Sequence, residues 1–183
     1  MPRPDVTETE TDRLLLRQWR ESDVDPLWAL QSQPEMMRFL DDGRPYTSIA
    51  QTRTWIEWHG ALWSDRGCSL WAVDRKGGGF IGWIGLTAAF EPDALRGSIE
   101  VGWFLDPAMQ GQGLATEGAS HALAVGFDQL GLDRILARCD SENTRSEAVM
   151  VRIGMSFVSR EHNAGRPGRD VTLYQQAAEE SRR

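Results

Sequence analysis

The stretch Asp106–Glu117, which reads DPAMQGQGLATE, decides the fold of this 183-residue chain. Gly111 and Gly113 allow a tight backbone turn and let a ligand approach the main chain closely. A helical pattern follows from Gly113 to Leu130, and the first N–H groups of such a helix have no partner inside it. Because those donors lie at the positive end of the helix dipole, the segment predicts an anion site, for which phosphate is the common ligand.

Residue spacing separates three kinds of phosphate-binding loop. A P-loop requires a lysine after its last glycine, but Leu114 stands there. A dinucleotide-binding loop requires a third glycine three residues after the second, where this chain has Thr116. The remaining pattern, Gln/Arg-x-x-Gly-x-Gly/Ala, is matched by Gln110–Ala115. Taken alone, the loop is also compatible with an ordinary strand-to-helix turn. Saturable binding of NAD or ATP would favour the dinucleotide-binding loop or the P-loop instead.

The rest of the chain predicts a mixed α/β domain with one central sheet. The expected strands are Leu14–Trp19, Ser69–Asp74, Phe80–Phe90, Ser98–Leu105, Arg134–Cys139, Met155–Arg160 and Val171–Tyr174. The expected helices begin near Ser22, Pro34, Ser48, Gly113 and Asn143. One right-handed parallel crossover runs from Ser98 to Cys139. We expect a single domain at residues 12–176, with flexible tails at 1–11 and 177–183.

Three further segments resemble the GNAT acyltransferases, and in particular their RimJ/RimL-like branch. Ile99–Leu105, IEVGWFL, is similar to the fourth strand of that branch, and Glu10–Arg17 is similar to its first. Asn143–Ser146 followed by Ile153–Met155 resembles its Asn-x-x-Ser … Leu-Gly-Phe segment. The resemblance covers about residues 8 to 175. It implies a GNAT-like fold, with a central, mostly antiparallel sheet of about seven strands that is splayed between strands 4 and 5 and flanked by helices.

The resemblance also implies that the chain binds acetyl-CoA as a co-substrate and uses no metal. The diphosphate would lie on backbone N–H groups of the loop, and the pantetheine arm would pair with the strand end at Trp103–Leu105. Asn143 would contact the cofactor from the other side. The residues assigned to the cofactor in this way are Trp103, Phe104, Leu105, Gln110, Gly111, Gln112, Gly113, Leu114, Ala115, Thr116 and Asn143. Because the loop has no basic side chain, its N–H donors and the helix end are expected to carry the phosphate contacts.

Acetyl transfer from a thioester to an amine needs a proton acceptor, an oxyanion donor and an acid for the leaving thiolate. Glu100 is the predicted base, since a carboxylate inside an apolar strand is unusual unless it faces a cleft; an outward-facing surface residue is the alternative. By resemblance, a backbone N–H near Phe104 or Leu105 serves the oxyanion. Many relatives have a tyrosine acid where this chain has Met150, and the branch gives that role to Ser146. The alternative role of the Ser146 hydroxyl is to cap or steady the helix start at Asn143–Ser146.

These features predict transfer of an acetyl group from acetyl-CoA to a primary amine, either a protein N-terminus or a small molecule. Direct attack in a ternary complex is the simpler mechanism, because no Ser-His-Asp or Cys-His arrangement is suggested. The alternative, which the missing tyrosine motivates, is a non-catalytic acyl-CoA-binding or regulatory domain. We expect the acceptor amine to bind near Gln33–Tyr46, Glu91–Gly97 and Glu161–Arg169. These residues do not identify the amine.

Composition limits the partners. The chain has 27 acidic and 20 basic residues and a net charge of −7, which argues against binding to nucleic acids or anionic membranes. No apolar run approaches the ~18–20 residues of a membrane span. Met1–Thr11 lacks the apolar core of a signal peptide, so a cytoplasmic protein is expected. Cys68 and Cys139 are too few for a disulfide framework or a metal site. The oligomeric state is left open, a homodimer included.

Overall fold

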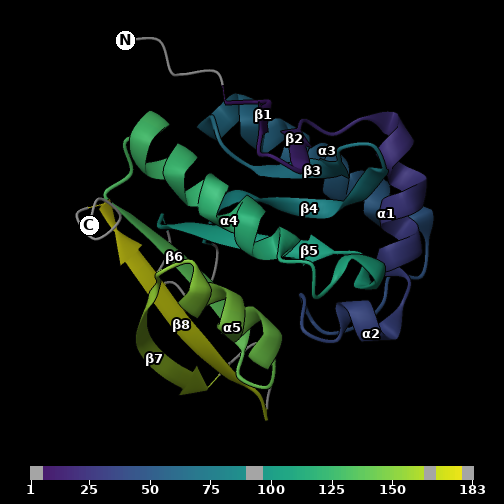
Figure 1. Ribbon diagram of the computed structural model, residues 1–183. Helices are drawn as coiled ribbons and strands as arrows, with labels where there is room; N and C mark the ends of the chain where they lie inside the picture. Colours follow the sequence, from purple (N-terminus) through teal and green to yellow (C-terminus); the bar gives the residue numbers. More distant parts are fainter. Residues whose placement is uncertain (1–5, 90–96, 163–167, 179–183) are drawn as a thin grey trace.

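The computed structural model describes residues 6–89, 97–162 and 168–178, and a single sheet runs through them (Figure 1). The strands are β1 (Thr9–Glu10), β2 (Leu14–Arg17), β3 (Leu70–Arg75), β4 (Gly79–Ala88), β5 (Ile99–Leu105), β6 (Arg134–Asp140), β7 (Ser156–His162) and β8 (Asp170–Ala177). Their order across the sheet is β1-β2-β3-β4-β5-β6-β8-β7. Every neighbouring pair is antiparallel except β5 and β6. The predicted mixed α/β fold, mostly antiparallel with one parallel crossover, is confirmed.

The eighth strand, β1, lies in the segment that we expected to be a flexible tail. Thr9 and Glu10 pair with β2, and Val6 is almost completely buried. The Val6 carbonyl also accepts a hydrogen bond of 2.9 Å from the indole N–H of Trp71. One apolar residue in an otherwise polar segment produces no periodic pattern, so the sequence does not indicate that this segment joins the sheet. The folded part of the chain therefore starts by Val6, before the expected boundary at residue 12.

The sheet opens between its only parallel pair of described strands. β5 and β6 are in register at one position, Glu100 opposite Leu136. On its other side, β5 stays paired with β4 from Ile99 to Leu105. β5 and β6 correspond to the strands numbered 4 and 5 in the sequence analysis. Their numbers differ by one because β1 was not among the expected strands. The predicted splay is thus present, and within the described ranges no strand pairs with this edge of β5 beyond Glu100.

Helices cover both faces of the sheet. They are α1 (Val24–Gln31), α2 (Pro34–Met37), α3 (Ile49–Arg66), α4 (Leu114–Ala124) and α5 (Thr144–Arg152). α4 and α5 lie over the near face in Figure 1, and α3 lies on the far face with α1 packed against it. Each face has its own apolar core, one containing Leu114 and Ala119 of α4 and the other Leu27 of α1 and Ile56 of α3.

Helix α4 is held very close to the sheet. A Cβ on Gly118 would lie 2.3 Å from Cδ1 of Ile84, and one on Gly126 would lie 2.5 Å from Cδ1 of Ile135. Gly126 belongs to a π-helical turn, Val125–Gln129, which replaces the last part of the long α-helix expected up to Leu130. Contact at both ends fixes α4, and this places the glycine loop at its start beside the end of β5.

A buried charge network ties β2 to the start of α1. The Arg17 side chain is 4% exposed and lies between two carboxylates. Its Nη1 is 2.7 Å from Oδ2 of Asp23, and its Nε is 2.7 Å from Oδ2 of Asp74. Removing one partner of a buried ion pair is strongly destabilising, because an uncompensated charge stays out of water.

We therefore expect Asp23→Asn to lower the free energy of unfolding by about 2 kcal/mol, since Asp74 still compensates part of the charge. Urea denaturation measures the change. Asp25→Asn is the control, because Asp25 is exposed two residues further on in the first turn of α1. Equal losses in the two variants would contradict the role of the Arg17 network.

Candidate active site

A cleft of about 1160 Å³ opens where β5 and β6 separate. One wall comes from α2 and the residues after it, from Glu35 to Asp41. Other lining residues come from the glycine loop and α5. Every site residue predicted from the sequence lines this cleft except Gln112. The structure therefore brings Glu100, Ser146 and the expected cofactor residues together in one place, while their roles stay predictions.

The glycine loop offers main-chain groups to this cleft. Gly111 and Gly113 have φ angles of +75° and +77°, a backbone conformation that favours glycine. Nothing lies within 4 Å of the position that a Cβ on Gly111 would take. Gly113 is the N-cap residue of α4 and makes no side-chain cap, so no capping side chain occupies the first N–H groups of the helix. The local geometry is that of an anion site with an open approach.

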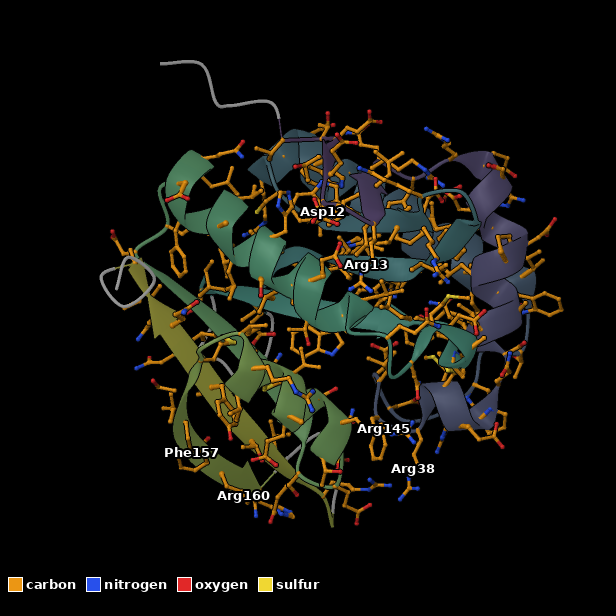
Figure 2. The ribbon with its side chains drawn as sticks, in the orientation of Figure 1. Asp12, Arg13, Arg38, Arg145, Phe157 and Arg160 are labelled. Carbon is orange, nitrogen blue, oxygen red and sulfur yellow. The ribbon has the colours of Figure 1, made fainter. Side chains whose placement is uncertain are left out.

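Two arginines flank the loop from distant parts of the chain, and the sequence did not point to either of them. The Nη1 of Arg13 donates to the Gln112 carbonyl at 2.9 Å, and its Nε donates to Glu117 of α4 at 2.6 Å. Arg145 of α5 donates to the side-chain oxygen of Gln110. Figure 2 labels both arginines. The loop itself has no basic side chain, as predicted, but positive charge is supplied beside it by tertiary contacts.

Glu117 holds Arg13 at the loop. It accepts hydrogen bonds from the Thr11 hydroxyl at 2.5 Å and from the Arg13 backbone N–H at 3.0 Å, in addition to the guanidinium. Burial raises the pKa of Glu117, but these hydrogen bonds and the charge of Arg13 outweigh that effect and lower it. The carboxylate is thus stabilised in its charged form, and it fixes the first turn of α4 to the start of β2.

The start of α5 has a defined cap. The side-chain oxygen of Asn143 accepts a hydrogen bond of 3.2 Å from the backbone N–H of Ser146. The capping group is therefore the Asn143 carboxamide, not the Ser146 hydroxyl that we considered as the alternative. Both residues line the cleft. Met150, which stands where many relatives have a tyrosine, is 1% exposed and belongs to the apolar core.

Glu100 faces the side of the sheet that carries α1 and α3. Along β5, Phe104 joins the core under those helices, whereas Val101 and Leu105 join the core under α4. Because successive strand residues point to opposite faces, Glu100 shares the face of Phe104. The Glu100 side chain is 13% exposed and lines the cleft, so the alternative of an outward-facing surface residue is wrong.

An arginine of β6 pairs with Glu100. The Nε of Arg138 lies 2.5 Å from Oε1 of Glu100, and its Nη2 donates to Oε2 at 3.1 Å. The shorter contact is an ion pair without hydrogen-bond alignment, since Oε1 accepts no hydrogen bond within the described part of the chain. Burial raises the pKa of Glu100 and the charge of Arg138 lowers it, and the net change is upward. A raised pKa suits a carboxylate that accepts a proton near neutral pH.

The remaining expectations concern metals, cysteines and the acceptor segments. Within residues 6–89, 97–162 and 168–178, no group of three or more His, Cys, Asp or Glu side chains is placed to hold a metal ion. Cys68 and Cys139 are both buried, and burial raises the pKa of Cys139 to about 11. Of the acceptor segments, 35–41 contributes to the cleft wall, but most of 91–97 and the centre of 161–169 lie outside the described residues.

In the ranges that the structure describes, no helix is both long and apolar enough to span a bilayer.

The glycine loop opens α4 beside the gap between β5 and β6, which is the arrangement that the resemblance to the GNAT acyltransferases implies. The family model for an acetyltransferase (GNAT) domain matches residues 13–156 of the chain. The protein therefore belongs to the GNAT family and is an acetyl-CoA-dependent N-acetyltransferase.

Individual relatives agree with this assignment. The chain is 30% identical over 146 residues to the uncharacterized N-acetyltransferase YoaA of Bacillus subtilis, covering 79% of this chain and 80% of that protein. A GNAT acetyltransferase structure from Bacillus anthracis superposes with a TM-score of 0.79 at 24% identity, covering 94% of this chain and 99% of that one. RimL, a ribosomal L7/L12 α-N-protein acetyltransferase in complex with coenzyme A, gives a TM-score of 0.74 at 25% identity, covering 91% and 95%.

Proposed function

We propose that the protein acetylates a primary amine by direct attack of the amine on acetyl-CoA, both substrates being bound at once. The observation that carries this proposal is one cleft that is lined both by the glycine loop and by the carboxylate of Glu100, whose side chain is 13% exposed. We also propose that the chain belongs to the RimJ/RimL-like branch, on the strength of the Asn143–Ser146 segment and the loop pattern.

The cofactor would enter from the side of α4 and α5. Its diphosphate would accept hydrogen bonds from N–H groups of Gln110–Ala115, with Thr116 nearby and with Arg13 and Arg145 adding positive charge at the loop. The pantetheine arm would extend along the open edge of β5 at Trp103–Leu105, where no strand in the described part of the chain pairs with that edge. This arrangement brings the thioester to the level of Glu100.

The chemistry then needs few groups. Glu100 takes a proton from the ammonium, directly or through a water, and the free amine nitrogen attacks the thioester carbon. A backbone N–H near Phe104 or Leu105 donates to the oxyanion of the tetrahedral intermediate. The carbon–sulfur bond breaks and the thiolate takes a proton from the Ser146 hydroxyl. The attacking nitrogen gives up its second proton, which returns to Ser146 through solvent, and Glu100 releases its proton to solvent. The products are the amide and coenzyme A.

Two measurements test the function. Calorimetry should show acetyl-CoA binding, and a CoA-release assay should show turnover with at least one amine among N-terminal peptides, polyamines, amino acids and aminoglycosides. Binding without turnover on the whole panel would favour the non-catalytic acyl-CoA-binding domain. Absence of binding at millimolar acetyl-CoA would overturn the proposal.

Ser146→Ala separates an acid role from a structural one. Because Asn143 provides the cap, the variant should unfold within about 0.5 kcal/mol of the wild type. If the hydroxyl protonates the thiolate, kcat should fall by about tenfold or more, since positioned proton transfer is a large catalytic effect. Thr144→Val, which removes a neighbouring hydroxyl of the same cleft, is the control. A kcat unchanged in Ser146→Ala would mean that the thiolate leaves without this acid.

A further inference from the structure

Three polar side chains form a row across the acceptor side of the cleft. Thr87 on β4 is directly opposite Glu100 on β5, so the two share a face of the sheet. Glu100 is in register with Leu136 on β6, and Arg138 is two residues further along the same face. All three line the cleft. The row places a hydroxyl, a carboxylate and a guanidinium side by side where the amine has to react.

The surroundings of this row are largely apolar. Met36, Phe39 and Leu40 come from α2 and the residues after it, and Trp83 stacks on Phe104 with ring centroids 5.8 Å apart. The acids Glu35 and Asp41 lie on the same wall as α2. Glu100 and Arg138 are the charged residues that the described strands contribute to this cleft, with side-chain exposures of 13% and 27%.

Fold stability is a poor explanation for the ion pair between Glu100 and Arg138. A buried ion pair contributes little net stability, because the desolvation of both charges offsets their attraction. The hydroxyl of Thr87 is also buried and has no hydrogen-bond partner in the described part of the chain, which is a cost in the free protein. A ligand that offers both a cation and an anion at adjacent positions would give the Thr87 hydroxyl a partner and would add a contact to each member of the Glu100–Arg138 pair.

We propose that the acceptor is a free α-amino acid without an acidic side chain, a proposal that rests on the proposed function. Its amine lies against Glu100, and its carboxylate lies against Arg138 and the Thr87 hydroxyl. In an α-amino acid the two charged groups are neighbours, as Glu100 and Arg138 are. A polyamine would bring a second ammonium against the guanidinium, and a peptide N-terminus would offer it only a neutral carbonyl. Glu35 and Asp41 would repel an acidic side chain at the wall of the cleft.

The test compares each amino acid with its own amide. L-Methionine, L-leucine, L-phenylalanine and L-arginine are assayed by CoA release beside their carboxamides, which keep the amine and side chain but lose the negative charge. The carboxylate holds the amine in its charged form, so the amide has the more reactive amine at a given pH. A preference for the acid therefore reports recognition. We expect kcat/KM to favour the acid by at least about 30-fold for the best pair.

Arg138→Gln should bring that acid-to-amide ratio to within about threefold of one, with the Kd for coenzyme A unchanged as evidence of folding. The control is Arg152→Gln, which removes an arginine of the same cleft on α5 and should keep the ratio of the wild type. A wild-type ratio near or below one, a ratio unaffected by Arg138→Gln, or turnover confined to polyamines or peptides would overturn the inference and leave the acetyltransferase proposal intact. Lack of turnover with every amine would overturn both.

Discussion

Glu100→Gln is expected to lower kcat by about 10²–10⁴-fold, while the Kd for acetyl-CoA stays within about twofold of the wild type. Glutamine keeps the size and part of the hydrogen bonding of glutamate, but it cannot take a proton from the ammonium. The cofactor should still bind, because Glu100 lies near the start of β5, whereas the glycine loop follows the end of that strand. Steady-state kinetics and calorimetry on the same preparations measure the two effects.

The pH profile shows whether the lost group is the base. Burial raises the pKa of Glu100 in spite of Arg138, so the acid limb of kcat/KM should lie above the usual range of a glutamate. Activity is present above that limb, where the carboxylate is charged, and is lost as the pH falls through it. In Arg138→Gln the lowering influence is gone, and the limb should move to higher pH. Glu57→Gln on the exposed face of α3 is the control for both measurements. An unmoved limb in Glu100→Gln would exclude this residue as the base.

Features that depend on a few consecutive residues were predictable from the sequence. The loop is an example, because glycine spacing and a following helix are local properties. The helix expected from Ser48 is another: Ser48 and Gln51 form a capping box at its start, and Gly67, with φ of +75°, ends it. Glu100 was noticed for the same kind of reason, since a charge inside an apolar strand stands out without any knowledge of its neighbours.

Partners supplied by tertiary contacts could not be predicted in this way. Arg13 reaches Gln112 across 99 positions of sequence, and Arg138 meets Glu100 across 38. The local sequence does not distinguish either arginine from other charged residues in or beside a strand. Only the topology shows what each one contacts. The topology also determines which charges lie near the glycine loop. The loop has no basic residue of its own, but the fold brings the guanidinium groups of Arg13 and Arg145 beside it. Sequence patterns singled out Glu100, the carboxylate that we propose as the base, but not Arg138, whose charge lowers its pKa.

Gly111→Val is expected to weaken coenzyme A binding by about 100-fold. A side chain at residue 111 would extend into the open space of the cleft, where it would keep the diphosphate from the loop N–H groups. Each hydrogen bond to a charged group is worth about 1.5–3 kcal/mol, so the loss of one or two such bonds accounts for the factor. Calorimetric titration with coenzyme A gives the Kd directly.

The substitution also forces valine into a left-handed backbone conformation, which costs about 1–3 kcal/mol of stability wherever it occurs. Gly77 isolates that cost, because it has a φ of +78°, lies in the turn between β3 and β4, and likewise has nothing within 4 Å of a Cβ. Gly77→Val should therefore lose as much stability as Gly111→Val and bind coenzyme A like the wild type. If both variants weaken binding equally, backbone strain is the cause and the loop does not hold the diphosphate. If neither does, the main-chain donors of Gln110–Ala115 are not the anion site, and the thioester is positioned by another part of the cleft.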